Sequence, residues 1–132
     1  MAADDDILSH MLCQLIYRSR VARRVRFADA EAIAAAAAKN NARSAISGLL
    51  LYTPTYFVQV LEGSRAAVES TFARIGSDHR HEEIVTLATR EIQERQFGDW
   101  GMRAVMPRRE VSAEVIGQLS GVAALELLLS SR

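Results

Sequence analysis

The sequence predicts an α+β fold: a ferredoxin-like β-α-β-β-α-β sheet with a fifth strand, two helices on one face, and further helices at the C-terminal end. Short apolar runs that suit strands alternate with two longer stretches that suit helices. The tripeptide Thr53-Pro54-Thr55 separates two of the apolar runs and suits a hairpin turn, because proline fixes the φ angle that a turn needs. A chain of 132 residues with 49% hydrophobic residues predicts one domain with one core.

The first half of the chain supplies three strands and one helix. Residues 11–17 (MLCQLIY) form a short apolar run that ends in an aromatic residue, which favours a buried strand. An alanine-rich helix follows to about Asn40, and Asp29 is expected to cap its start because its carboxylate can accept from the free N–H groups there. Residues 46–52 and 56–62 are the two strands of the predicted hairpin.

The second half begins with another helix. Ser64 is expected to cap it, and Gly76 is expected to end it in the C′ position. Residues 84–90 predict a fourth strand, and residues 100–106 predict a fifth strand that stops at Pro107.

The last part of the chain changes in character after Pro107. Ser112 can cap a short helix, Gly121 interrupts it, and a very apolar stretch follows. Such a tail must bury its leucines on the sheet or against a partner. We therefore expect an N-terminal extension over 1–10, one main domain over 11–107 and a helical tail over 108–132 that packs on the sheet or on a partner.

Composition excludes several classes of function. Sixteen basic and sixteen acidic residues cancel, so no global charge favours nucleic acid or a membrane surface. Cys13 is alone, which excludes an internal disulfide. His79 and His81 are a poor metal pair without a third ligand, and no metal site is expected. We find neither a signal peptide nor an apolar segment of about 18 residues, so a cytoplasmic location is expected.

Two polar side chains stand out among apolar neighbours. Tyr17 shares a strand face with Cys13 and Leu15, and Gln59 shares one with Phe57 and Leu61. A buried amide without a partner costs about 1–3 kcal/mol, so both groups need hydrogen bonds. The simplest interpretation is that they satisfy each other or the backbone, since most buried polar groups are structural.

Two further pairs allow a structural or a functional interpretation. Asn40 and Asn41 can be turn residues at a helix end, or their amides can pair with a heterocycle that carries adjacent C=O and N–H groups. Trp100 and Met102 share one face of the predicted last strand and suit core packing.

Taken together, five segments resemble the BLUF family, sensors of blue light using flavin. They occur in the family's order and spacing, and they are LIYRS (15–19), NNARSAISGLLLY (40–52), FVQVLEG (57–63), FARIGSDHRH (72–81) and FGDWGM (97–102). The family's fold is the ferredoxin-like arrangement predicted above. The resemblance implies a bound flavin between the two helices, with FAD expected and FMN or riboflavin as alternatives.

The resemblance also implies a role for each matching residue. Tyr17 matches the electron donor to the excited flavin, and Gln59 matches the amide between that phenol and the ring. The pair whose arrangement is thought to change with light is matched by Trp100 and Met102. The remaining positions match contacts to the ring, the ribityl chain or the phosphate: Ile33, Asn40, Asn41, Arg74, Ile75, Asp78, Arg80 and His81.

The implied function is a photoreceptor without substrate turnover. A carboxamide carries an acceptor and two donors, so rotation or tautomerisation of Gln59 can change the hydrogen bonds to the flavin without any change in net charge. A stronger hydrogen bond to a flavin carbonyl would shift the absorption to the red. The signal would pass to an unidentified downstream protein or through self-association into a homo-oligomer, because only 25 residues (132 − 107) follow Pro107.

Two other functions stay open on the residues alone. Arg74, Arg80 and His81 could bind an anion in a flavin-dependent or phosphate-directed enzyme of the same fold. The apolar tail would also suit a flavin-free dimerisation module.

Overall fold

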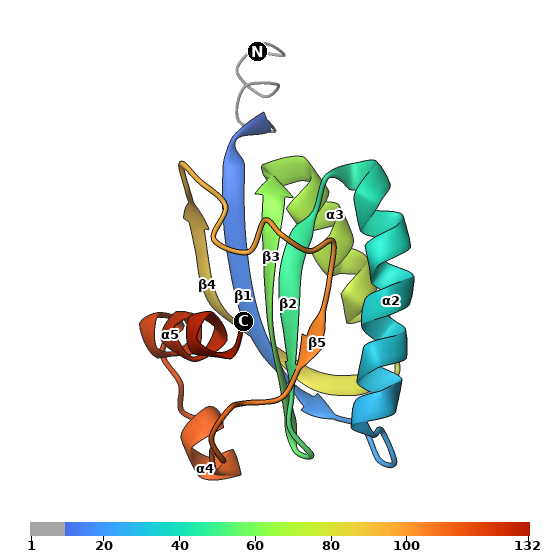
Figure 1. Cartoon of the computed structure of the whole chain (residues 1–132), viewed down its shortest axis with the longest axis vertical. Helices are drawn as coiled ribbons and strands as arrows, with labels where there is room; N and C mark the ends of the chain where they lie inside the picture. Colours follow the sequence, from blue (N-terminus) through green and yellow to red (C-terminus); the bar gives the residue numbers. More distant parts are fainter. Residues whose placement is uncertain (1–9) are drawn as a thin grey trace.

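The computed structural model describes residues 10–132 and has a five-stranded sheet between two helical layers (Figure 1). The predicted N-terminal extension over 1–10 lies outside the described residues except for its last residue. The elements follow in the order β1 (Leu12–Val21), α2 (Phe27–Ser44), β2 (Ser47–Tyr52), β3 (Tyr56–Ser64), α3 (Arg65–Gly76), β4 (His81–Glu91), β5 (Ala104–Val105), α4 (Ala113–Ile116) and α5 (Gly121–Ser131).

The strand order β4-β1-β3-β2-β5 confirms the predicted ferredoxin-like fold with a fifth strand. The first four strands in this order pair antiparallel, and β5 adds to β2 in parallel. β1 and β3 lie in the middle of the sheet, and their register places Tyr17 directly opposite Gln59. The two polar residues identified in the sequence therefore face each other at the centre of the fold.

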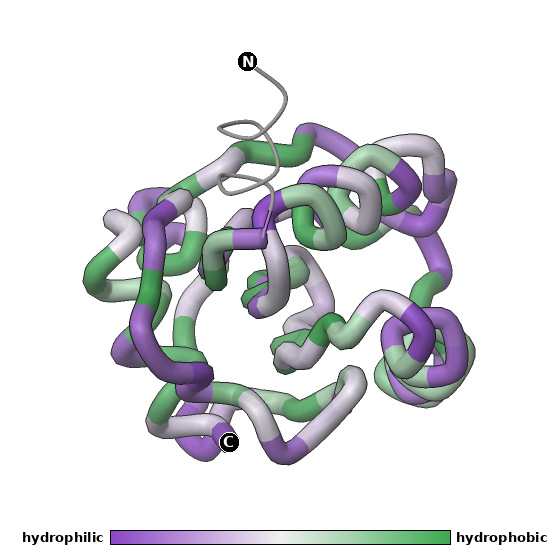
Figure 2. Tube along the Cα trace, turned by 90° about the horizontal axis from the view of Figure 1, so that it is seen from above, coloured by the Kyte–Doolittle hydropathy of each residue, from purple (hydrophilic) through white to green (hydrophobic). Residues whose placement is uncertain are grey.

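Each face of the sheet carries its own apolar cluster. The cluster on the α2 and α3 side contains Leu15, Tyr17, Phe57 and Leu61, as the period-two pattern of the strands predicts. The other cluster joins Ile16, Val58 and Val60 of the strands to Ile116 and Leu128 of α4 and α5, which buries the apolar tail on the sheet. Figure 2 shows the layers from above, with α2 seen nearly end-on.

Local sequence signals set several of the boundaries. The Ser64 hydroxyl accepts from the Ala67 N–H at 3.2 Å, and the Ser112 hydroxyl accepts from the Val115 N–H at 3.2 Å, so both predicted caps are confirmed. The Asp29 prediction is wrong: α2 begins earlier, and Asp29 accepts from the Arg26 N–H at 2.8 Å as the third residue of the helix.

Three other boundaries differ from the sequence predictions. α2 continues past Asn40 and Asn41 to Ser44, and Ala45 caps its end with a φ of 52°. Gly76 is the last residue of α3 and has no positive φ; the helix ends instead where the Ser77 N–H donates to the carbonyls of Arg74 and Ile75. The predicted strand over 100–106 is reduced to β5. The Trp100 and Arg103 carbonyls still accept from the Gly48 and Leu50 N–H groups of β2, but between them Gly101 lies against Ala38 of α2.

Candidate functional site

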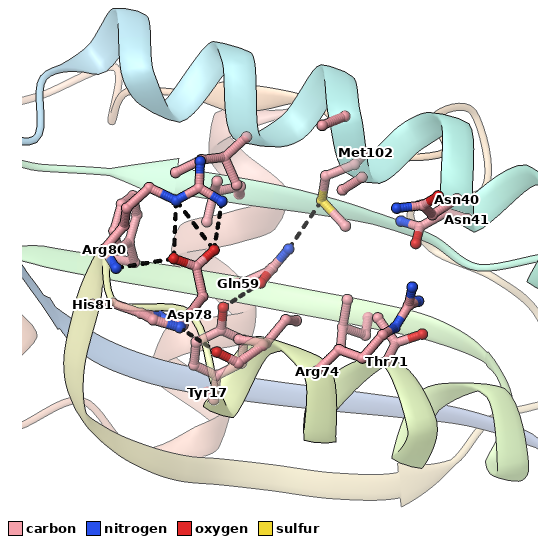
Figure 3. Close-up of a pocket in the computed structure, with 17 residues that line it drawn as sticks. Tyr17, Asn40, Asn41, Gln59, Thr71, Arg74, Asp78, Arg80, His81 and Met102 are labelled. Atoms are coloured by element: carbon pink, nitrogen blue, oxygen red, sulfur yellow. Dashed lines mark hydrogen bonds and ion pairs between the residues drawn. The ribbon is translucent and has the colours of Figure 1, made fainter.

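A cavity of about 260 Å³ lies between α2, α3 and the sheet (Figure 3). Its size is near the lower end of the range of about 300–1,000 Å³ for small-molecule pockets. Every site residue expected from the resemblance lines it except Trp100. The lining consists of Tyr17, Ile33, Ala36, Ala37, Asn40, Asn41, Leu50, Phe57, Gln59, Leu61, Thr71, Arg74, Ile75, Asp78, Arg80, His81 and Met102.

Gln59 links Tyr17 to Met102 across the floor of the cavity (Figure 3). The Tyr17 hydroxyl donates to Gln59 Oε1, and Gln59 Nε2 donates to Met102 Sδ at 3.2 Å. A thioether sulfur can only accept, so the amide N–H₂ must face Met102 and the amide oxygen must face Tyr17. The orientation of Gln59 is therefore fixed by its two partners.

The surroundings keep the Tyr17 phenol protonated. Burial raises the pKa of Tyr17 above its ordinary value, and the negative charge of Asp78 raises it further. Tyr17 is 1% exposed, so its neutral form is strongly favoured. Tyr17 consequently stays a hydrogen-bond donor to Gln59 over the whole physiological pH range.

Met102 is held beside Gln59 by the loop between β4 and β5. The buried side chain of Asn41 donates from Nδ2 to the Gly101 carbonyl at 2.6 Å. This bond ties the residue before Met102 to α2. The Asn41 amide therefore has a structural partner as well as a place in the cavity lining.

Trp100 lies elsewhere, and the prediction that it shares a strand face with Met102 is wrong. The residues 100–103 precede β5 and do not follow the alternation of a strand. Trp100 packs against the apolar cluster that α4 and α5 cover, whereas Met102 belongs to the cluster on the α2 and α3 side. The guanidinium of Arg103 lies 5.1 Å from the centre of the Trp100 ring.

Asp78 and Arg80 form an ion pair at the rim of the cavity. Arg80 Nε lies 2.9 Å from Asp78 Oδ1 and Nη2 lies 2.5 Å from Oδ2. The Arg80 hydrogen bonds lower the pKa of Asp78 to about 2, and the same contacts raise the pKa of Arg80. Both groups are therefore charged at neutral pH, and Arg74 is the lining arginine without such a pair among the described residues.

Both ring nitrogens of His81 are engaged by the protein. Nε2 lies 2.7 Å from the Ile75 carbonyl, which can only accept, so Nε2 carries a proton. Nδ1 lies 2.9 Å from Ser19 Oγ. His81 thereby joins the end of α3 to β1 and shapes the rim of the cavity.

Thr71 is a lining residue that sequence reasoning missed. Its hydroxyl has no hydrogen-bond partner among the residues that the structure describes, although Thr71 is only 6% exposed. An unpaired buried hydroxyl that lines a cavity indicates a place for a polar group of a ligand. A threonine on an amphipathic helix gives no signal of this kind in the sequence.

The structural roles of Glu62 and Arg95 were also not predicted from the sequence. Glu62 is fully buried on the α5 side of β3, where its carboxylate accepts from Gln14 Nε2 at 2.8 Å and from the N–H groups of Gln96 and Phe97 at 3.1 and 2.8 Å. Arg95 donates to Ser47 Oγ at 2.7 Å. The two side chains anchor the loop that carries Met102.

Comparison with known proteins identifies the family to which the residues around the cavity belong. The model of the family described as "BLUF: Sensors of blue-light using FAD" matches residues 12–103, which include all the lining residues. The chain belongs to the BLUF family. It is thus a domain of the type that senses blue light with a bound flavin.

Relatives of known structure and function agree with this family. The dark-state structure of BlrB, a BLUF protein, is 36% identical, covers 92% of this chain and 94% of its own, and superimposes with a TM-score of 0.79. Photoactivated adenylate cyclase subunit beta of Euglena longa is 38% identical over 90 residues, which are 67% of this chain and 10% of that protein. The antirepressor BluF of Escherichia coli (strain K12) is 35% identical over 92 residues, 23% of its length.

The residues of this BLUF cavity fit a flavin. Ile33 and Ile75 come from different helices and offer apolar surfaces to a flat ring. Asn40 and Asn41 supply amides, and the unpaired Thr71 hydroxyl supplies a donor, for the carbonyls and ring nitrogens at the polar edge of a flavin. The described residues contain no group of three or more His, Cys, Asp or Glu side chains that could hold a metal ion.

The unpaired hydroxyl leads to a first prediction. We expect Thr71→Val to weaken flavin binding by about 2- to 13-fold, because one hydrogen bond contributes about 0.5–1.5 kcal/mol. Flavin-free protein should keep its stability, since the Thr71 hydroxyl makes no hydrogen bond within residues 10–132 that the substitution could remove. Titration calorimetry with FAD and thermal unfolding of the flavin-free protein measure the two effects separately. A variant that binds flavin like the wild type would show that Thr71 Oγ1 does not contact the ligand.

Within residues 10–132, no helix is both long enough and apolar enough to cross a membrane.

Proposed function

We propose that Tyr17, Gln59 and Met102 form the hydrogen-bond switch of this BLUF photoreceptor. The observation that carries the proposal is the chain of contacts from the Tyr17 hydroxyl through the Gln59 amide to Met102 Sδ inside the cavity. A bound flavin supplies the absorption of blue light and, when excited, a strong one-electron oxidant. Tyr17 is the side chain at the cavity that can release an electron and a proton together.

The contacts of Gln59 give the switch two distinguishable states. In the first state Gln59 accepts from Tyr17 and donates to Met102. If the amide rotates, its N–H₂ group exchanges places with the oxygen. If it changes tautomer, a proton moves from Nε2 to Oε1, so the oxygen becomes a donor and the nitrogen can accept. Simple rotation would direct Nε2 toward the Tyr17 oxygen and Oε1 toward Met102, and a sulfur cannot donate to that oxygen. Met102 would then lose its hydrogen bond and be free to move.

We further propose FAD as the flavin and light sensing without substrate turnover. Arg74 at the rim offers a positive charge for the phosphates of FAD or FMN, and riboflavin would leave it unused. The titratable groups Tyr17, Asp78, Arg80 and His81 are each engaged by another protein group, which argues against a free general base in the cavity. Self-association stays a prediction.

A difference spectrum tests the function. Protein loaded with FAD should show a reversible red shift of its flavin absorption under blue light and return in the dark. Loading with FMN and riboflavin in parallel measures how much the phosphates contribute to binding. A protein that binds flavin but shows no spectral change under blue light would refute the proposed switch.

A further inference from the structure

A second hollow lies on the other side of Met102. It is a shallow groove of about 740 Å³ beside β5, between the start of α2 and the end of α5. Its lining is Phe27, Glu31, Ala34, Ala35, Met102, Arg103, Ala104, Val105, Met106, Pro107, Arg108, Ser131 and Arg132. Its lining does not include Tyr17 or Gln59.

Of the described residues, Met102 is the one that lines both hollows. On the cavity side its sulfur accepts from Gln59 Nε2 at 3.2 Å. On the other side the same residue forms part of the groove wall, next to Arg103. A change in the contact between Gln59 and Met102 would therefore change the shape of the groove directly.

The groove has the chemistry of a site for an acidic chain. Three arginines line it, Arg103, Arg108 and Arg132, against a single acidic side chain, Glu31, among its lining residues. Met106 is 54% exposed and offers an apolar contact between the charges. A partner with carboxylates around an apolar side chain complements this pattern.

The backbone at the groove favours an extended partner. β5 is the last strand of the sheet and pairs with β2 on one side only, so its outer edge is open within the described chain. An extended peptide can add to such an edge through main-chain hydrogen bonds, while its side chains reach the flanking pockets. Charged residues beside the edge then select which segments can add to it.

We propose that this groove docks an acidic, extended segment of a downstream protein, and that Met102 makes the docking dependent on light. The first part stands on the charges, the exposed Met106 and the open edge of β5. The second part rests on the switch proposed above. The two parts can therefore fail separately.

Binding of a model peptide tests the docking. The probe is a strand-length peptide in which glutamate alternates with valine, labelled with a dye that absorbs red light so that the flavin is not excited. Its fluorescence anisotropy is titrated with FAD-loaded protein in the dark and under blue light. A peptide with lysine in place of glutamate is the control for charge.

A matched pair of variants locates the site. We expect the double variant Arg103→Glu, Arg108→Glu to weaken binding of the acidic peptide by at least about tenfold, because attraction becomes repulsion at two positions. The exposed Arg43 lies in the last turn of α2 and outside the groove. Arg43→Glu makes the same charge change and should alter binding by less than about twofold, since exposed charges that are far apart are screened. The flavin spectrum of each variant reports whether it is folded and loaded.

The outcomes separate the two parts of the proposal. Equal binding of the lysine peptide, or unchanged binding by the double variant, would overturn the docking site. Sedimentation velocity covers one further case: a dimer of the wild type that the double variant loses would assign the groove to a second copy of the chain. A normal red shift without any effect of light on peptide binding would overturn the role of Met102. Charge-dependent binding without a red shift would support the docking and refute the switch.

Discussion

Gln59→Leu is expected to abolish the light-induced red shift while the protein still binds flavin. Leucine has nearly the size of the glutamine side chain but can neither accept from Tyr17 nor donate to Met102, so both contacts of the proposed switch disappear. The Tyr17 hydroxyl then lacks its acceptor, which costs about 1–3 kcal/mol of stability if it finds no other. Difference spectroscopy of the FAD-loaded variant measures the red shift, and urea unfolding measures the loss of stability.

Gln93→Leu is the matched control for this experiment. Gln93 is exposed in the loop between β4 and β5, so the same substitution there should leave the red shift unchanged. A normal red shift in Gln59→Leu would show that another group makes the hydrogen bond to the flavin. Loss of the red shift in both variants would point to the loop as a whole rather than to the Gln59 amide.

Glu62→Ala is expected to cause the largest loss of stability. The substitution removes the acceptor of the Gln96 and Phe97 N–H groups and one of the two acceptors of Gln14 Nε2, which keeps the Gln96 side-chain oxygen at 2.8 Å. Gln14 and Phe97 are buried and Gln96 is half-buried. At about 1–3 kcal/mol for each of the two buried donors, on Gln14 and Phe97, the free energy of unfolding should fall by at least about 2 kcal/mol. Urea unfolding of the wild type and the variant, at equal flavin loading, measures the difference.

Glu69→Ala is the control, because Glu69 is exposed and its one ion pair within residues 10–132 is with Arg65, one helical turn away. Its substitution should cost no more than about 0.5 kcal/mol. If Glu62→Ala unfolds at nearly the same urea concentration as Glu69→Ala, water or another side chain must satisfy the three donors. In that case Glu62 would not anchor the loop.

The central sheet and both of its faces could be predicted because they follow from local rules. Alternation along β3 placed Gln59 with Phe57 and Leu61, and the structure confirms all three on the same side of the sheet. The serine caps at Ser64 and Ser112 were also readable, since each hydroxyl accepts from a backbone N–H three residues ahead. The fold class therefore needed little beyond periodicity and turn residues.

The loop between β4 and β5 could not be predicted, because contacts distant in sequence decide its path. Trp100 and Met102 are two residues apart, and alternation would place them together. Asn41 draws the Gly101 carbonyl toward α2, and Glu62 fixes Gln96 and Phe97 on the opposite side of the sheet. Each partner lies more than 30 residues away along the chain, so no local sequence pattern predicts these contacts.

The site residues divide in the same way. Asn41, Gln59 and Arg80 could be named from the resemblance, and all three line the cavity. Thr71 could not, because its significance lies in the absence of a partner, which only coordinates reveal. His81 could be named, but the engagement of both its nitrogens by Ser19 and Ile75 could not.

Gln59 and Glu62 contact the same loop from opposite faces of β3, and the two differ in the number and strength of their hydrogen bonds. The Glu62 carboxylate accepts from three donors, and a rotation of the Gln59 amide would not change these hydrogen bonds. Gln59 holds Met102 by one weak N–H to sulfur contact. The loop is therefore fixed at residues 96–97 and can move most easily at Met102. A displacement of Met102 would move the start of β5, two residues further along the chain, while residues 96–97 stay bound to Glu62.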